Sequence, residues 1–441
     1  MASIILGMGF GWCSLSQAQM GGMGGGMGGG MPTVPGTAFG GATDPSSMQA
    51  VNGLRLIPSV QISERYDSNV FFASKSQLQG ISPEDVVTTV VPQVRGLYAD
   101  GEKLVKINAA VGAVGSYYAN NTGLSYVGVN AGAGLDMSDL VSRWRPGAKW
   151  TVSEMYFHSP QPPAFLQGGP RGEQANPLVA GFQAIRTNTS SNSVSTTFEL
   201  PLSKTVNLTG SYTNSFIRYG ASKVPRAGTL ITQNRQGYTA GLAVQTSIHD
   251  TVTVDFTDSE FDQGSFGTFS ARGGTLGWTH AFSPAVSINA VGGAQMLSGE
   301  SNGVQFSVIA PLGSLALSWN DPTTSMALAY RSGITPSFQF QGGAMLNHTV
   351  SFNMTQKTPI RDLTGLLGAN YSVANEYGSN SGGGAFSWTT VGGTAGLLYP
   401  VTQKMFLTLT YNYQNVDRVF SGEHFAFDKH VVQLSLAQAF Y

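Results

Sequence analysis

Apolar and polar side chains alternate along most of the chain from Leu54 onward. Successive side chains of a β-strand point to opposite faces of its sheet, so the alternation predicts strands with one apolar and one polar face. The alternating segments start near the following residues: Leu54, Val105, Val127, Val206, Val252 and Met405. They run for about 10 to 15 residues, whereas soluble strands average about 5 to 6 and bilayer-crossing strands need about 9 to 11. This length favours a transmembrane barrel over a soluble sandwich.

The connections between the expected strands alternate in length, as in outer-membrane barrels with tight turns at one end and longer loops at the other. Short connections are expected at 100–103, 138–142, 202–205, 248–250, 283–285, 321–323, 358–361 and 400–404. The connections at the other end of the strands are expected at 66–84, 119–123, 158–186, 219–233, 259–272, 298–303, 334–343, 376–384 and 418–427. Most of these are longer; 119–123 and 298–303 are the shorter ones. Counting between these junctions gives about eighteen antiparallel strands. Sixteen stay open as an alternative, because Pro311 interrupts the strand drawn from 304 to 319.

Composition supports a sheet with lipid on one face. Apolar residues make up 41% of the chain and charged residues only 11%, against about 25% charged residues in ordinary soluble domains. No run of about 18 consecutive apolar residues predicts a transmembrane helix. Aromatic residues fall toward expected strand ends, where an interfacial girdle would lie: Tyr98, Trp144, Trp150, Tyr156, Trp278, Trp319, Trp388 and Tyr399. We therefore predict an all-β, up-and-down antiparallel barrel in the outer membrane of a Gram-negative-type bacterium.

The N-terminal part differs from the rest of the chain. Residues Ile4 to Leu15 are mostly apolar, and Ser16 and Ala18 make a small-x-small cleavage site, which predicts a signal peptide over 1–19. A disordered apolar tail is the alternative. The Gly/Met- and Pro-rich segment 20–52 is expected to be disordered, because glycine-rich chain has little to bury. The barrel then covers 53–441, and an even number of strands leaves the N-terminus in the periplasm.

The last expected strand ends at the C-terminus. Its apolar residues Val432, Leu434, Leu436 and Phe440 alternate with polar or small ones, and the chain ends in Tyr441. This strand resembles the terminal signal that the barrel-assembly machinery recognises in outer-membrane proteins. Such a strand would close the barrel and remove the exposed edge of the sheet. The expected partners are therefore this machinery, outer-membrane lipid and lipopolysaccharide.

Charged residues of the expected strands should face the lumen, because a charge facing lipid at mid-depth costs about 2 to 4 kcal/mol. The candidate lumen-facing residues are Arg55, Arg65, Arg95, Lys106, Arg145, Lys149 and Arg331, with Asp136, Glu199, Asp255 and Asp362. Most of the basic ones belong to the first five expected strands, so they could form one basic wall that favours anionic solutes. The interpretation that we favour over it is a network of ordinary ion pairs or charges at the periplasmic rim.

The sequence offers little catalytic chemistry. It has no G-x-S-x-G segment, no P-loop and no metal-ligand spacing among its six histidines. Cys13 is the single cysteine, and the net charge of −1 gives no argument for nucleic acid. Asp255, Asp258, Glu260 and Asp262 could bind Ca²⁺ at a barrel rim, although a solvated loop explains them better. We expect no enzyme, no cofactor and no metal.

The stretch Ile62-Ser-Glu-Arg-Tyr-Asp-Ser-Asn-Val-Phe71 resembles the opening of the β-barrel porin 2 family, in which an extended strand leads into an aromatic-Asp-x-Asn-hydrophobic motif. The resemblance covers 54–441 in architecture and about ten residues in motif. It implies an outer-membrane channel associated with exopolysaccharide export, and periplasmic polysaccharide-export components as further partners.

Two functions follow from these observations. The first is a porin-like channel that passes or exports a hydrophilic solute such as an exopolysaccharide, through a lumen of neutral polar side chains. The second is a structural or adhesive barrel with a closed lumen, whose surface loops bind partners. We expect the position of loop 158–186, inside or outside the lumen, to distinguish them.

Overall fold

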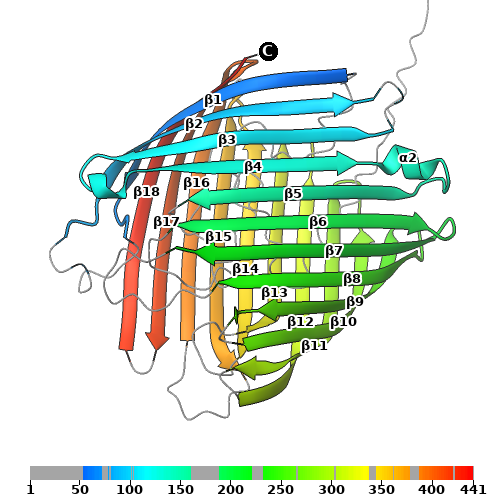
Figure 1. Cartoon of the computed structure of the whole chain (residues 1–441). Coiled ribbons are helices and arrows are strands. Elements are labelled where there is room, and N and C mark those ends of the chain that lie inside the picture. Colours follow the sequence, from blue (N-terminus) through cyan, green and yellow to red (C-terminus); the bar gives the residue numbers. More distant parts are fainter. Residues whose placement is uncertain are drawn as a thin grey trace, which may run out of the picture.

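The computed structural model consists of one antiparallel sheet (Figure 1). It describes residues 53–71, 78, 81–100, 102, 104–159, 188–220, 232–264, 267–301, 304–336, 344–360, 362–377, 387–420 and 423–440. The predicted signal peptide, the Gly/Met-rich segment, most of loop 158–186 and Tyr441 lie outside these residues. The predictions made for them therefore stay predictions.

The sheet has eighteen strands, as the alternation predicts. Their bounds are β1 Gly53–Asp67, β2 Asp85–Ala99, β3 Lys106–Tyr118, β4 Tyr126–Asp136, β5 Lys149–Ser159, β6 Thr189–Pro201, β7 Val206–Tyr219, β8 Gln233–Gln245, β9 Asp250–Asp262, β10 Gly267–Ala281, β11 Val286–Ser301, β12 Val304–Asn320, β13 Thr324–Pro336, β14 Ala344–Lys357, β15 Thr364–Tyr377, β16 Ser387–Thr402, β17 Met405–Phe420 and β18 Glu423–Ala439. Two short helical turns also occur in the described chain, η2 Thr122–Leu124 and α2 Ser138–Ser142.

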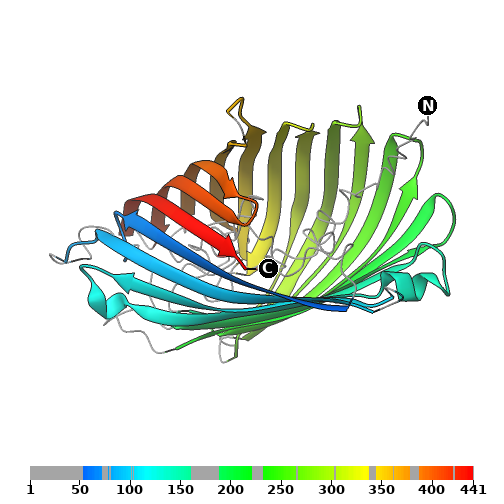
Figure 2. The same cartoon turned by 90° about the horizontal axis from the view of Figure 1, so that it is seen from above.

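The sheet closes into a barrel because its first strand pairs with its last. β1 pairs with β2 on one side and with β18 on the other, from Ser59↔Ala439 to Asp67↔Val431. Figure 2 shows β1 in blue beside β18 in red. We call this pairing the closing seam. Among the described residues every strand therefore pairs with two neighbours and the sheet has no edge strand, which is the condition for a sheet to stand in lipid.

Pro311 does not split its strand, so the count is eighteen and not sixteen. β12 runs unbroken from Val304 to Asn320, with Pro311 opposite Ala294 of β11. Its pairing with β13 begins only at Gly313↔Ser332. Proline lacks a backbone donor and is tolerated where a ladder is absent. Pro311 lies just past the end of the second ladder, which explains its place within a strand.

The outer face of the barrel is apolar, as the terminal strand β18 illustrates. Val432, Leu434 and Leu436 are 43%, 48% and 40% exposed. Their neighbours Val431, Gln433 and Ser435 face the interior and are only 3%, 5% and 4% exposed. Comparable exposed apolar residues occur on strands around the barrel: Val94, Val111, Val129, Leu242, Val254, Leu276, Leu315, Leu328, Val350, Leu367, Leu397 and Leu409. An apolar surface of this extent on a closed barrel is the pattern of membrane-spanning barrels.

We call the barrel end with the short connections the turn side and the opposite end the loop side. Exposed aromatic residues lie near the turn-side strand ends and in the adjacent connection, as the girdle prediction requires: Tyr98, Trp144, Trp150, Trp278, Trp319 and Tyr399. Trp388 was expected in a girdle at a strand end; it does lie at a strand end, but its placement in a girdle is wrong. It is the second residue of β16, at the loop side, and is 1% exposed because it faces inward against Met345, Ala374 and Val416. No helix among the described residues is both long enough and apolar enough to cross a bilayer.

Candidate functional site

The candidate site is the inner face of the barrel, and much of it carries neutral hydroxyl groups. Directly opposite residues of β5 and β6 are hydrogen-bonded across the ladder, Thr151 Oγ1 to Thr197 Oγ1 at 2.7 Å and Ser153 Oγ to Ser195 Oγ at 2.7 Å. A similar contact joins Thr89 Oγ1 and Ser116 Oγ at 3.1 Å. Such side chains can exchange hydrogen bonds with water or with solute hydroxyl groups without carrying a charge.

Glycines let longer polar side chains lie flat on this inner wall. A Cβ added at Gly112 would lie 2.6 Å from Asn130 Oδ1. The side chain of Asp255 lies over Gly241 in the same way, and that of Asn370 lies over Gly392. Each pair is formed by directly opposite residues of adjacent strands. At each of these positions the opposite polar side chain lies in the space that a side chain on the glycine would fill. The glycines therefore keep the polar wall smooth.

Two of the predicted lumen-facing bases form ion pairs at the turn side. Lys106 Nζ lies 2.6 Å from Asp139 Oδ2 and 3.9 Å from Asp136 Oδ2. Lys149 Nζ lies 3.0 Å from Glu199 Oε2. The acids of the predicted set thus accompany these bases, instead of lying apart from them.

The remaining predicted bases are spread over the barrel. Arg145 lies outside the strands, between α2 and β5, and donates to the carbonyl oxygens of Pro201 and Leu202. Arg55 lies near the turn-side end of β1, opposite Leu97. Arg95 lies on the inner face and donates from Nε to Asn108 Oδ1 at 3.0 Å. Arg331 of β13 lies opposite Ser314 of β12 and Thr349 of β14.

The predicted acidic residues near β9 do not form one group. Alternation along β9 places Asp255 on the inner face, opposite Gly241 and Thr275. Asp258, Glu260 and Asp262 lie on the outer face, where Asp258 Oδ2 is 3.2 Å from Arg272 Nε. Asp362 lies in the turn before β15 with φ of 61°. Within the described residues no group of three or more His, Cys, Asp and Glu side chains could hold a metal ion.

On the strands from β9 to β14 the loop-side part of the inner face is apolar, which the sequence did not reveal. Phe261, Phe269 and Leu297 are 4%, 2% and 0% exposed and pack together with Phe306 and Val308. Alternation does not distinguish these strands from the others, so only the residue types at their inward positions could have revealed the apolar cluster. Near the loop-side ends the inward positions change from Ser and Thr to Phe, Leu and Val. On these strands the interior is therefore apolar toward the loop side, whereas buried polar side chains such as Asp67, Ser116 and Lys429 line the loop-side interior elsewhere.

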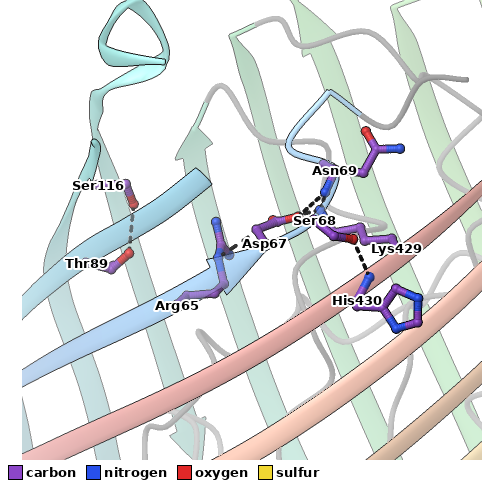
Figure 3. A network of polar contacts seen from close by, with 8 residues as sticks. All are labelled: Arg65, Asp67, Ser68, Asn69, Thr89, Ser116, Lys429 and His430. Carbon is purple, nitrogen blue, oxygen red and sulfur yellow. Dashed lines mark hydrogen bonds and ion pairs between the residues drawn. The ribbon is translucent and has the colours of Figure 1, made fainter. Parts of the chain in front are cut away.

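A buried polar cluster lies at the loop-side end of the closing seam (Figure 3). Lys429 Nζ of β18 lies 2.8 Å from Asp67 Oδ2 of β1, and the two side chains are 9% and 2% exposed. Lys429 Nζ also donates to the carbonyl oxygen of Asn69 at 3.0 Å. Asp67 Oδ1 accepts from the backbone N–H of Asn69 at 3.0 Å, and Arg65 Nε lies 3.8 Å from Asp67 Oδ2. Asp67 and Asn69 belong to the aromatic-Asp-x-Asn motif noted in the sequence, whereas its aromatic residue, Tyr66, is 42% exposed.

Comparisons with known proteins find similar structures only. No protein-family model and no curated protein matches the sequence. Similar solved structures include OccAB4 of Acinetobacter baumannii, with a TM-score of 0.45 and 10% identity over 88% of this chain and 98% of that chain. OpdQ of Pseudomonas aeruginosa has a TM-score of 0.46 and 9% identity, over 89% of this chain and 100% of that chain. The outer membrane protein opdK of Pseudomonas aeruginosa has a TM-score of 0.44 and 10% identity, over 88% of this chain and 99% of that chain. Similarity at this level establishes no shared function, and the resemblance to the β-barrel porin 2 family stays a prediction.

Proposed function

We propose that this chain forms an outer-membrane channel that passes a hydrophilic solute. The observation that carries the proposal is the neutral hydroxyl ladder of β5 and β6 inside a closed barrel with an apolar outer face. Barrels of sixteen to eighteen strands are wide enough to hold water. Ser and Thr side chains offer weak, replaceable hydrogen bonds, so a hydrated solute can move along them without being held.

Export of an exopolysaccharide is the finer form of this proposal. A neutral sugar chain is rich in hydroxyl groups, which matches the smooth wall formed by Gly112 with Asn130 and by Gly392 with Asn370. The motif resemblance points the same way. In this proposal the signal peptide directs export, the assembly machinery inserts the barrel, and the N-terminal segment reaches periplasmic polysaccharide-export components.

Two experiments test the coarser and the finer form separately. Liposomes containing the purified barrel should swell in isotonic solutions of small neutral sugars, and protein-free liposomes should not. Absence of swelling would contradict a passive channel. Deletion of the gene should remove polysaccharide from the cell surface and leave sugar uptake by other porins unchanged. Normal surface polysaccharide in the deletion strain would contradict the export role.

A structural or adhesive barrel is the second candidate. It is favoured by the apolar inner cluster of Phe261, Phe269 and Leu297, since an open aqueous mouth would leave such side chains exposed to water. This candidate predicts no swelling in any sugar solution, and loss of surface attachment when the loops are shortened. The swelling assay therefore separates the two candidates.

A further inference from the structure

The first segment after β1 turns into the barrel mouth instead of away from it. Val70 is 3% exposed and packs with Val87 and Tyr118, whose side chains face the interior from the loop-side ends of β2 and β3. Phe71 packs against the same group. Residues Ser68–Phe71, which we call the inturned segment, thus cover the inner wall of β2 and β3 at the loop side.

The inturned segment is held from both sides of the closing seam. The backbone N–H of Ser68 donates to the carbonyl oxygen of His430 at 2.9 Å, and the backbone N–H of His430 donates to Ser68 Oγ at 2.8 Å. Lys429 adds a charge to this attachment, because one ammonium group binds both the Asp67 carboxylate and the Asn69 carbonyl oxygen. The first and last strands therefore hold the segment jointly.

We propose that Lys429 is a positioning residue that fixes the inturned segment as a constriction of the channel, and that this constriction limits the size of the solute that passes. The proposal deepens the channel function and rests on it. A buried ammonium bound to a carboxylate and a carbonyl oxygen fixes geometry strongly, because any displacement leaves a buried charge without its partners. Loss of that ammonium releases Asn69 and the residues after it, while the hydrogen bonds between Ser68 and His430 and the nine-residue register from Ser59 to Asp67 still close the barrel.

The substitution Lys429→Met tests the proposal, with Lys149→Met as its matched control. Both replace an ion-paired lysine with an apolar side chain of similar length, but Lys149 is 47% exposed at the turn side and does not contact the inturned segment. The double variant Asp67→Asn with Lys429→Met removes both charges of this ion pair, so no buried carboxylate is left without Lys429 if the single variant folds poorly; Arg65, whose side chain is 17% exposed, then has an amide in place of the carboxylate.

Thiol labelling reports the position of the segment without any assumption about transport. Val70→Cys is introduced into a Cys13→Ser background, and its reaction with a water-soluble maleimide is followed in folded protein. We expect labelling at least tenfold faster with Lys429→Met and with the double variant, and an unchanged rate with Lys149→Met. Equal rates in all variants would overturn the positioning role.

Channel size is then read from the largest neutral polyethylene glycol that reduces the single-channel current. The size limit should rise with Lys429→Met and stay the same with Lys149→Met. Faster labelling with an unchanged size limit would overturn the constriction and leave the attachment standing. If neither the wild type nor the variants carry current, the proposed channel function fails, and the labelling rates alone then decide whether Lys429 holds the segment.

Discussion

Asn192 Nδ2 donates a hydrogen bond of 2.9 Å to Glu154 Oε1 on the outer face of the barrel. Glu154 follows Trp150 and Val152 on that face of β5, and its opposite residues are Ala133 and Val194. It is thus an acidic side chain in apolar surroundings, above an aromatic residue of the turn-side girdle. The hydrogen bond to Asn192 reduces the cost of placing it there but does not remove it.

Replacing Glu154 with Leu should therefore stabilise the barrel in a bilayer. A carboxylate facing lipid costs less than a cation at the same depth, so the expected gain is about 1 to 2 kcal/mol. The measurement is urea unfolding in lipid vesicles. Glu260→Leu is the control, because Glu260 lies near the loop-side end of β9, where neighbouring outer-face residues are acidic. Equal effects of the two substitutions would contradict a lipid-facing Glu154.

The paired residues Leu409 and Leu434 test which face of the last two strands contacts lipid. Either one replaced by Arg should destabilise the barrel by about 2 to 4 kcal/mol, because the charge then faces the bilayer. Thr408→Arg, one residue away on the inner face, should cost clearly less. Urea unfolding in vesicles measures all three variants. A larger loss for Thr408→Arg would show that the faces are reversed.

Two adjacent glycines of β11 should respond oppositely to alanine. A Cβ at Gly293 would lie 2.9 Å from Thr275 Cα and would also meet the carbonyl oxygen of Gly274, so the backbone would have to move. We expect Gly293→Ala to destabilise the barrel by about 1 to 3 kcal/mol. A Cβ at Gly292 meets nothing within 4 Å, and Gly292→Ala should stabilise it by about 0.5 to 1 kcal/mol. The same sign for both variants would contradict the register of β10 and β11.

The turn between β12 and β13 should make stability depend on pH. Asp321 accepts from Trp319 Nε1 and from the backbone N–H groups of Thr323 and Thr324, and these bonds hold the pKa of Asp321 below its usual range. The bonds require the carboxylate. Their contribution is complete above the unfolded pKa of about 3.9 and is lost as the pH falls through the lower folded pKa.

Asp321→Ala should therefore lower the thermal unfolding midpoint at pH 7, and the difference from the wild type should shrink toward pH 2. Asp321→Asn keeps one oxygen acceptor and should show a smaller loss at pH 7. A difference between wild type and Asp321→Ala that is the same at both pH values would exclude the ionised carboxylate as the cause.

The sequence predicts the barrel well because alternation is a local property. Two-sided strands such as the one containing Val432, Leu434 and Leu436 show their inner and outer faces without knowledge of any partner, and the structure confirms these faces. Trp388 shows the limit of this reasoning. Near a strand end, a shift of one residue moves a side chain to the other face, and the residue type alone suggested the wrong one.

The cluster at the closing seam could not be predicted from local pattern. Asp67 and Lys429 are 362 residues apart in the chain, and their contact depends on the register in which β1 meets β18. The ion pairs of Lys106 and Lys149 depend on register in the same way. Sequence reasoning found the charged residues, but only the pairing of strands shows which charges meet.

Ion current through the purified full-length barrel in a planar lipid bilayer tests the central claim most directly. The account predicts discrete current steps in neutral salt solution, which neutral sugars small enough to enter the lumen reduce. A barrel that inserts with correct folding, shown by its heat-dependent mobility in gels, but carries no current in the wild type or with Lys429→Met would contradict the channel.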